Sequence, residues 1–309
     1  MRKTFVNSLL ALCSKHPQLM VVNADLGYSV FEPFMQSNPD NYLNVGVAEA
    51  DMVGIAAGLA LCGKRPFCYS ITPFIALRDL EQVRVDVCYH NLPVILVASG
   101  AGLCYGSLGP THHGTEDMAV MRAMPNMHVF APSDAYELGQ LMPLVFELAR
   151  PSYIRIGRSV EPAVHEEGSK PEITIGKATT VKSLGNDFAI ISCGNMVWTG
   201  MQALNKLAEK GHKGTLISMH TVKPLDEKTV CALGKKMPIV TLEEHSIIGG
   251  LGSAVAECLV DNHIPQPKFT RIALADSFQH KIGSHEFLRA QNGLTPDLVA
   301  QKIEKAISK

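Results

Sequence analysis

A glutamate stands where a short apolar segment meets a helix rich in small residues. Asn44-Val-Gly-Val-Ala-Glu49 leads into this helix, which carries Gly54 and Gly58 four residues apart. Each glycine costs a helix about 1 kcal/mol relative to alanine, so we expect another backbone or a ligand to approach this face. Open α/β sheets bind ligands at such strand-to-helix turns, which makes Glu49 a candidate functional carboxylate. The alternative is a helix N-terminal acid that is merely favoured by the helix dipole.

Aromatic side chains close a second apolar segment, Arg65-Pro-Phe-Cys-Tyr69-Ser-Ile-Thr-Pro-Phe74. Flat rings at the end of a strand suit a ligand that needs a stacking face. Tyr69 and Phe74 are the candidates, and the sequence leaves open which of them faces a ligand. Packing of these rings in the core is the alternative.

Two adjacent histidines, His112 and His113, follow a glycine-rich segment at residues 100–110. Gly100-x-Gly102 lacks the third glycine of a dinucleotide fingerprint, and Gly-Pro interrupts the place where a helix should open, so we reject NAD binding. Neighbouring side chains in a loop rarely share one ion, and no supporting ligand cluster is visible. We therefore expect no metal ligand in this segment.

Polar and cationic side chains stand at two further strand ends. Asp25 and Ser29 lie in Asn23-Ala-Asp-Leu-Gly-Tyr-Ser, and Arg155 and Arg158 lie in Tyr153-Ile-Arg-Ile-Gly-Arg. The forked donors of arginine suit a phosphate better than the point charge of lysine. For either arginine alone, a surface salt bridge is the alternative.

Short apolar runs alternate with helical patterns along the chain, which is typical of a parallel sheet wrapped by helices. Residues 19–23, 42–45, 65–70, 94–99, 128–131 and 152–156 predict strands, and residues 49–62, 75–88, 116–123 and 134–149 predict helices. A second, smaller series spans residues 188–272, after a stretch rich in proline, glycine and charge. We predict an α/β fold with two doubly wound domains, residues 1–160 and 181–309, joined by a linker at 161–180.

The composition excludes several classes of protein. Lys and Arg number 28 and Asp and Glu 29, which argues against a nucleic-acid groove or an anionic membrane surface as partner. Charged residues at 18% and apolar ones at 46% exclude a disordered chain. No stretch of 18 uncharged apolar residues occurs, so we expect no membrane span. Eight scattered cysteines without a CxxC pair, and an N-terminal amphipathic helix instead of a signal peptide, indicate the cytoplasm.

Several of these segments resemble the thiamine-diphosphate enzymes of the transketolase family. The segment that starts Gly46-Val-Ala-Glu49 and ends at Gly58 resembles the family pattern G-I/V-x-E-x-x-M-x-x-x-A-x-G. The segment from Gly109-Pro-Thr-His to Pro125-Asn resembles the pattern GPTHQ…ED…MR…PN. A Glu-Glu-His…Gly-Gly-Leu-Gly turn at residues 243–252 resembles the family's C-terminal domain. The first predicted domain would then be the pyrimidine-binding domain and the second the transketolase C-terminal domain.

The resemblance implies the following roles. Glu49 is hydrogen-bonded to N1′ of the cofactor's aminopyrimidine and pushes the ring toward its imino form, which makes Glu49 catalytic and cofactor-binding. Asp25 lies near the thiazolium, and Tyr69 or Phe74 lines the aminopyrimidine pocket. The substrate contacts are Ser29, His112, Arg158 and Arg155, of which His112 is also catalytic and Arg158 matches the motif better than Arg155. His113 stands where the family has Gln, and its role is open.

The resemblance covers nearly the whole chain, but only the C-terminal half of a full-length transketolase. The family's diphosphate half carries a Gly-Asp-Gly, and none occurs in these 309 residues. We therefore expect thiamine diphosphate to be shared with a separate diphosphate-binding N-terminal subunit, which mainly holds Mg²⁺, in an α2β2 assembly that is inactive without it. The expected reaction moves a two-carbon ketol unit from a ketose or its phosphate to an aldose or its phosphate. The alternatives are a subunit like 1-deoxyxylulose-5-phosphate synthase or a 2-oxoacid dehydrogenase E1 beta subunit, and a non-catalytic scaffold half.

Overall fold

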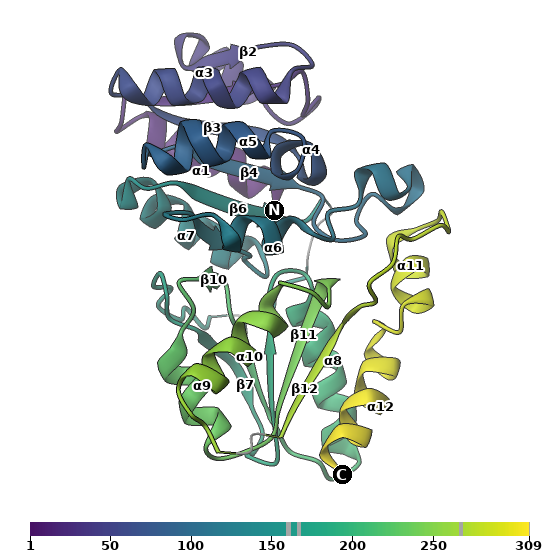
Figure 1. The fold of residues 1–309 in the computed structure, drawn as a ribbon. Coiled ribbons are helices and arrows are strands. Elements are labelled where there is room, and N and C mark those ends of the chain that lie inside the picture. Colours follow the sequence, from purple (N-terminus) through teal and green to yellow (C-terminus); the bar gives the residue numbers. More distant parts are fainter. Residues whose placement is uncertain (159–161, 166–167, 266–267, 309) are drawn as a thin grey trace.

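Two open sheets, each covered by helices, follow one another along the chain (Figure 1). The computed structural model describes residues 1–158, 162–165, 168–265 and 268–308. Both sheets are mostly parallel, and helices flank them, so the predicted α/β class with two doubly wound units is confirmed.

The N-terminal sheet has seven strands in the order β10-β5-β6-β4-β3-β1-β2. Neighbours pair in parallel except β10, which runs antiparallel to β5. Strands β1, β4 and β6 are buried at every position, as expected of central strands covered on both faces. The strands are β1 (Leu19–Asn23), β2 (Tyr42–Asn44), β3 (Arg65–Ile71), β4 (Ile95–Ser99), β5 (His128–Phe130), β6 (Ser152–Ile156) and β10 (Thr221–Lys223).

The helices of this half pack on both faces of its sheet. They are α1 (Arg2–Cys13), α2 (Glu32–Ser37), α3 (Glu49–Leu61), α4 (Thr72–Ala76), α5 (Leu80–Gln82), α6 (Asp117–Ala123) and α7 (Ala135–Leu148). Short 3-10 turns are η1 (Pro39–Asn41), η3 (Gly106–Leu108) and η4 (Pro110–His112), and η2 (Val83–Tyr89) is π-helical. The Asp134 side chain accepts a hydrogen bond from the Glu137 amide and so caps α7.

The predicted helix over residues 75–88 is wrong as a single element. The structure breaks it into α4, α5 and η2, with Arg78 and Asp79 at the first break. Arg78 leaves the helical path to reach a buried carboxylate, and Asp79 turns into the interior. Tertiary contacts thus override the local helical pattern, and π-helical turns often accompany functional sites.

The second sheet has five strands in the order β12-β11-β8-β9-β7, with β7 alone antiparallel to its neighbour. Its strands are β7 (Thr179–Ser183), β8 (Ala189–Ser192), β9 (Thr215–Ser218), β11 (Ile239–Ser246) and β12 (Phe269–Leu274). Its helices are α8 (Met196–Glu209), α9 (Glu227–Gly234), α10 (Leu251–Asp261), α11 (His285–Gln291) and α12 (Pro296–Ile307).

The proposed linker, residues 161–180, lies partly outside the described residues. Within its described part, Ile173 is buried in the N-terminal core and the Pro171 carbonyl accepts a hydrogen bond from Tyr136 at 3.0 Å. Strand β7 begins at Thr179, and β10 crosses from the second half of the chain to extend the first sheet. A strand from the second half of the chain therefore belongs to the first sheet. The domain boundaries stay a prediction.

A buried arginine joins the two halves. Arg155 on β6 is 2% exposed, and its Nε lies 2.8 Å from Asp117 Oδ2. Its Nη2 donates to the Gly114 carbonyl at 2.6 Å and to the Glu244 carbonyl, on β11 of the second sheet, at 2.9 Å. One guanidinium thus holds the start of α6, the loop before it and the second sheet together.

The Glu244 side chain makes a second connection across the same junction. Its carboxylate accepts from the Leu103 amide at 2.6 Å and lies 2.7 Å from His285 Nε2 and 2.6 Å from Arg289 Nε. Burial raises the pKa of Glu244, but Arg289 and His285 outweigh burial and hold this pKa well below its ordinary value. The carboxylate is therefore charged throughout the physiological range.

We expect Arg155→Ala to lower the free energy of unfolding by about 3–5 kcal/mol, because the buried Asp117 carboxylate loses its cationic partner and, among the described residues, keeps only the hydrogen bond from the Tyr153 hydroxyl. Chemical denaturation followed by circular dichroism measures this change. Lys206→Ala is the matched control, since it removes an exposed ion pair with Asp297 and should change stability little. An Arg155 variant as stable as the control would contradict the assigned role.

Candidate active site

Glu49 begins α3 directly after the turn that follows β2. Its side chain is buried, and its two oxygens accept from Ser70 Oγ at 3.1 Å and from Arg78 Nη1 at 2.6 Å. The Arg78 side chain is 49% exposed, so the carboxylate lies one side chain beneath the surface. One carboxylate oxygen is thus paired with a nitrogen donor, the half-exposed Arg78 guanidinium.

Phe74 lies next to this ion pair, and His112 lies next to Phe74. The Arg78 guanidinium lies 4.2 Å from the centroid of the Phe74 ring, and the Phe74 and His112 rings meet edge to face at 5.1 Å. Burial and the nearby Arg78 charge both lower the pKa of His112. A neutral imidazole at pH 7 can both donate and accept a hydrogen bond.

Tyr105 and Arg158 extend the row further. The Tyr105 ring lies 6.2 Å from that of His112, and the Arg158 guanidinium lies 4.8 Å from the centroid of Tyr105. A continuous row of contacts thus leads from the Glu49 carboxylate to Arg158. The sequence analysis missed Tyr105, because the glycine-rich segment around it has no periodicity that would place its ring.

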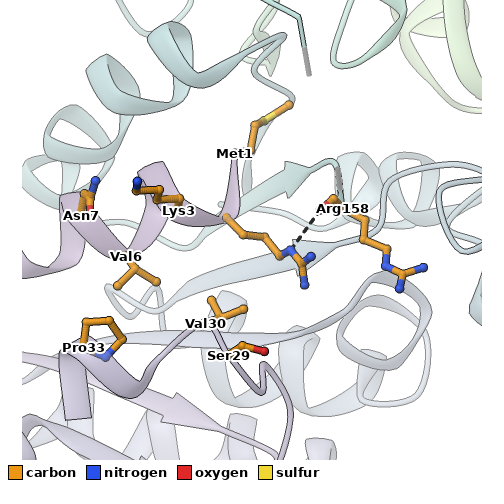
Figure 2. Close-up of a pocket in the computed structure, with 9 residues that line it drawn as sticks. Met1, Lys3, Val6, Asn7, Ser29, Val30, Pro33 and Arg158 are labelled. Carbon is orange, nitrogen blue, oxygen red and sulfur yellow. Dashed lines mark hydrogen bonds between the residues drawn. The ribbon is translucent and has the colours of Figure 1, made fainter. Parts of the chain in front are cut away.

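Ser29 and Arg158, predicted as substrate contacts, line one cavity of about 660 Å³. Figure 2 shows Lys3, Ser29 and Arg158 around this cavity. Arg2 also lines it, and its Nε donates to the Arg158 carbonyl at 3.0 Å. The cavity therefore gathers three cationic side chains and a hydroxyl, a donor set that suits an anionic group.

Arg2 and Lys3 were not among the predicted site residues. The signal for them is the pair of cations that begins the N-terminal amphipathic helix. Sequence alone gives no reason to place this helix start beside the ends of β1 and β6, which the fold brings together at the cavity.

Asp25 lies on the exposed loop after β1 and is tied to the turn before Glu49. Asn44 Nδ2 donates to Asp25 Oδ1 at 2.9 Å, while Asn44 Oδ1 accepts from the amides of Asp25 and Gly46 at 3.0 Å each. Asp25 has a left-handed backbone at φ +56°, a conformation that the side chain of Asn44 secures. Asn44 is thus a supporting residue that the sequence analysis did not single out.

Tyr69 lies apart from the row. It is buried, with its ring 5.8 Å from Phe5 and 5.0 Å from Phe31. Side chains alternate along β3, so Ser70 faces Glu49 while Tyr69 points into the core on the other side of the sheet. Of the two aromatic candidates, Phe74 contacts Arg78, the partner of Glu49, and Tyr69 is corrected to a core residue.

Arg155 and His113 also lie elsewhere than in the cavity. Arg155, expected among the substrate contacts, is enclosed in the domain junction, where Asp117 and two carbonyls bind its guanidinium. His113 is buried close to Glu244, and burial lowers its pKa. Within the described part of the chain, its Nε2 has no hydrogen-bond partner. Both belong to the contact between the halves.

Among the described residues, no group of three or more His, Cys, Asp and Glu side chains is placed to hold a metal ion. Nor does any helix within the described ranges have the length and apolar character needed to cross a membrane.

The chain is similar to known proteins over most of its length. Residues 1–162 match the transketolase pyrimidine-binding domain and residues 176–299 the transketolase C-terminal domain. The chain is 39% identical to the 6-deoxy-6-sulfo-D-fructose transketolase subunit SqwH of Clostridium sp. (strain MSTE9), covering 96% of this chain and 90% of that protein. It is 37% identical to an apulose-4-phosphate transketolase subunit of Phocaeicola vulgatus, covering 85% of each.

A solved structure described as a split gene transketolase, inactive beta4 tetramer, superposes with a TM-score of 0.88 at 34% identity, covering 99% of this chain and 97% of that chain. The synthase alternative is also matched. The 1-deoxy-D-xylulose-5-phosphate synthase of Trichormus variabilis is 35% identical over 98% of this chain, but the chain spans 48% of its length. The resemblance inferred from the motifs is thus confirmed, and the split-subunit interpretation is better supported than the synthase.

A second carboxyl, Asp79, lies in the interior near Glu49. It is fully buried, and within the described residues neither of its oxygens has a hydrogen-bond partner. Burial raises the pKa of Asp79 to about 8, and the nearby Glu49 charge adds to the effect. The folded state therefore binds this proton more tightly than the unfolded chain, whose ordinary value is 3.8. Its contribution to stability is complete below that value and is lost as the pH rises through about 8.

We expect Asp79→Asn to raise the melting temperature relative to the unsubstituted chain by an amount that grows between about pH 5 and pH 8. The amide carries no charge to bury, so the penalty that the carboxyl incurs on ionisation disappears. Thermal melts across this range measure the difference. Asp51→Asn, at an exposed position on α3, is the control and should show no comparable trend. A constant difference for Asp79→Asn would contradict the buried, unpaired carboxyl.

Proposed function

The chain belongs to the transketolase family as the C-terminal subunit of a two-chain ketol transferase, and on this premise we propose that it completes a thiamine-diphosphate site together with a separate N-terminal subunit. The observation that carries the proposal is the unbroken row from the buried Glu49 carboxylate to the cationic cavity. The row joins a group suited to cofactor chemistry with a place for an anionic substrate.

The residues around Glu49 fit the aminopyrimidine half of the cofactor. Glu49 holds a buried carboxylate oxygen toward a nitrogen donor, a place now taken by Arg78, and Phe74 offers a ring beside it. Thiamine diphosphate, when bound, supplies the nucleophile and electron sink for transfer of a two-carbon unit. Glu49 would hold a proton at N1′ of the aminopyrimidine, and Asp25, fixed by Asn44, would face the remainder of the cofactor.

We assign the diphosphate and Mg²⁺ mainly to the partner subunit. The chain contains no Gly-Asp-Gly, the family's metal-binding segment. Helix α3 supports the partner assignment, since an added Cβ at Gly54 or Gly58 would meet nothing within 4 Å. Val47 and Leu61 at its two ends are 78% and 69% exposed. Such an open face of small and apolar residues is suited to cover by another chain. The assembly would be α2β2 and its location the cytoplasm.

The cavity beside α1 would bind the anionic end of the sugar. Ser29, Arg158, Arg2 and Lys3 supply hydroxyl and cationic donors there. His112, along the row toward Glu49, would exchange hydrogen bonds with the oxygens of the ketose and the aldose. The two relatives act, by name, on a sulfonated and a phosphorylated sugar, and both are anions that this donor set can bind.

A ketol-transfer assay tests the function directly. The chain is assayed alone and mixed with a diphosphate-domain subunit, in the presence of thiamine diphosphate, Mg²⁺, xylulose 5-phosphate and ribose 5-phosphate. Activity in the mixture alone is the expected result. Activity of the isolated chain would contradict the shared site. Cofactor binding by the mixture without transfer would favour the synthase, the E1 beta type or another sugar, and absence of both would favour the scaffold.

We expect Glu49→Gln to lower kcat of the mixture by about 100- to 10,000-fold, because the amide cannot hold or pass a proton at N1′. Steady-state kinetics measure the loss, and Glu81→Gln on the exposed surface of α5 is the matched control. Full activity of the Glu49 variant would refute the proposed chemistry.

We expect Arg158→Gln to raise KM for a phosphorylated ketose by about ten- to a hundredfold, the loss of a hydrogen bond to a charged group. The KM for the matching unphosphorylated ketose should change little, because that sugar lacks the anion. An equal change for both sugars would contradict an anion site at the cavity.

A further inference from the structure

Tyr105 is a buried aromatic residue that no motif singled out. It lies on the loop between β4 and α6 and is 9% exposed. The centroid of the His112 ring lies 6.2 Å from that of Tyr105. The Arg158 guanidinium lies over the Tyr105 ring, 4.8 Å from its centroid. It is therefore the contact between the predicted catalytic histidine and the predicted anion-binding arginine.

The backbone of the loop is shaped around this ring. Gly100 has a φ of +91°, and a Cβ at that position would lie 2.1 Å from Tyr105 Cε2. Any other residue at position 100 would force the ring to move. The Tyr105 carbonyl also accepts from the Leu108 amide at 2.8 Å, which closes the turn that follows. The glycine thus leaves the space that the ring occupies, and the turn fixes the backbone that carries it.

Arg158 needs such a restraint. It is exposed and lies just beyond the end of β6, and its contacts among the described residues are the Tyr105 ring and, through its backbone carbonyl, Arg2. A long side chain without a partner samples many rotamers, and ordering it costs free energy when a ligand binds. The aromatic face of Tyr105, 4.8 Å from the guanidinium, is the contact that restrains this side chain.

We propose that Tyr105 is a positioning residue for the anionic end of the substrate, acting through Arg158. The inference rests on the proposed function and adds a determinant of substrate affinity to it. A guanidinium held over an aromatic face is ordered before the ligand arrives, so more of its interaction with the oxyanion appears as affinity. The shared chemistry is a tetrahedral oxyanion, phosphate or sulfonate.

The test compares Tyr105→Met, Tyr105→Leu and Tyr105→Phe in the reconstituted two-chain enzyme. Loss of the aromatic face should raise KM for the phosphorylated ketose about two- to thirtyfold, the range of a cation–π contact, with kcat nearly constant. Phenylalanine keeps the face and should restore the original KM. The inhibition constant of inorganic phosphate gives a second readout and should weaken in parallel with KM. Melting temperatures show whether each variant folds. The methionine and leucine variants differ in volume, so if one of them folds poorly the other still provides the test.

A double variant shows whether Tyr105 acts through Arg158. Tyr105→Met combined with Arg158→Gln should be no worse than Arg158→Gln alone, because the second change removes the group that the first one positions. Additive losses would overturn the proposal, and so would equal KM changes for phosphorylated and unphosphorylated sugars. If Arg158→Gln raises KM and Tyr105→Met does not, the inference fails while the proposed function stands. If neither changes KM, the anion site itself fails.

Discussion

The site depends on the contacts that the buried guanidinium of Arg155 makes. It binds Asp117, at the start of α6, and the carbonyls of Gly114 and Glu244. The Glu244 carboxylate in turn binds the Leu103 amide. The loop that carries Tyr105 and His112 is therefore held at both ends by contacts with the second sheet. The C-terminal half thus supports the site by fixing this loop, although none of its side chains belongs to the row.

The site has a buried interior with defined hydrogen bonds and an outer face that the described residues leave uncovered. Glu49 is enclosed by Ser70 and Arg78, and the buried Asp79 carboxyl nearby has no hydrogen-bond partner among the described residues. On the outside, the glycines of α3 leave a surface without neighbours among the described residues. A half-site that works with a second chain has this character, because its own residues are ordered beforehand and the remaining contacts come with the partner.

Cationic groups occur at both ends of the row, and their surroundings differ. Arg78 faces a buried carboxylate, so its charge is balanced within the chain. Arg158, Arg2 and Lys3 line a cavity, and within the described ranges Arg158 contacts an aromatic face and no acidic side chain. Balanced charge suits a place where a cofactor ring exchanges a proton, and unbalanced positive charge suits a place where an anion is bound. Under the proposed function, this difference would give the row a direction from cofactor to substrate.

The sequence alone determined the α/β class, most strand positions and the place of Glu49 at a strand-to-helix turn, because alternation, periodicity and helix starts depend on neighbouring residues. Tertiary structure decided the rest. It placed Phe74, on α4, against Arg78, while Tyr69 on β3 points into the core. It enclosed Arg155 in the domain junction and broke the helix expected over residues 75–88 so that Arg78 reaches Glu49. It also brought Arg2, Lys3 and Tyr105 to residues far away in the chain. Such contacts depend on how helices and strands pack against one another, and a local sequence pattern does not specify that packing.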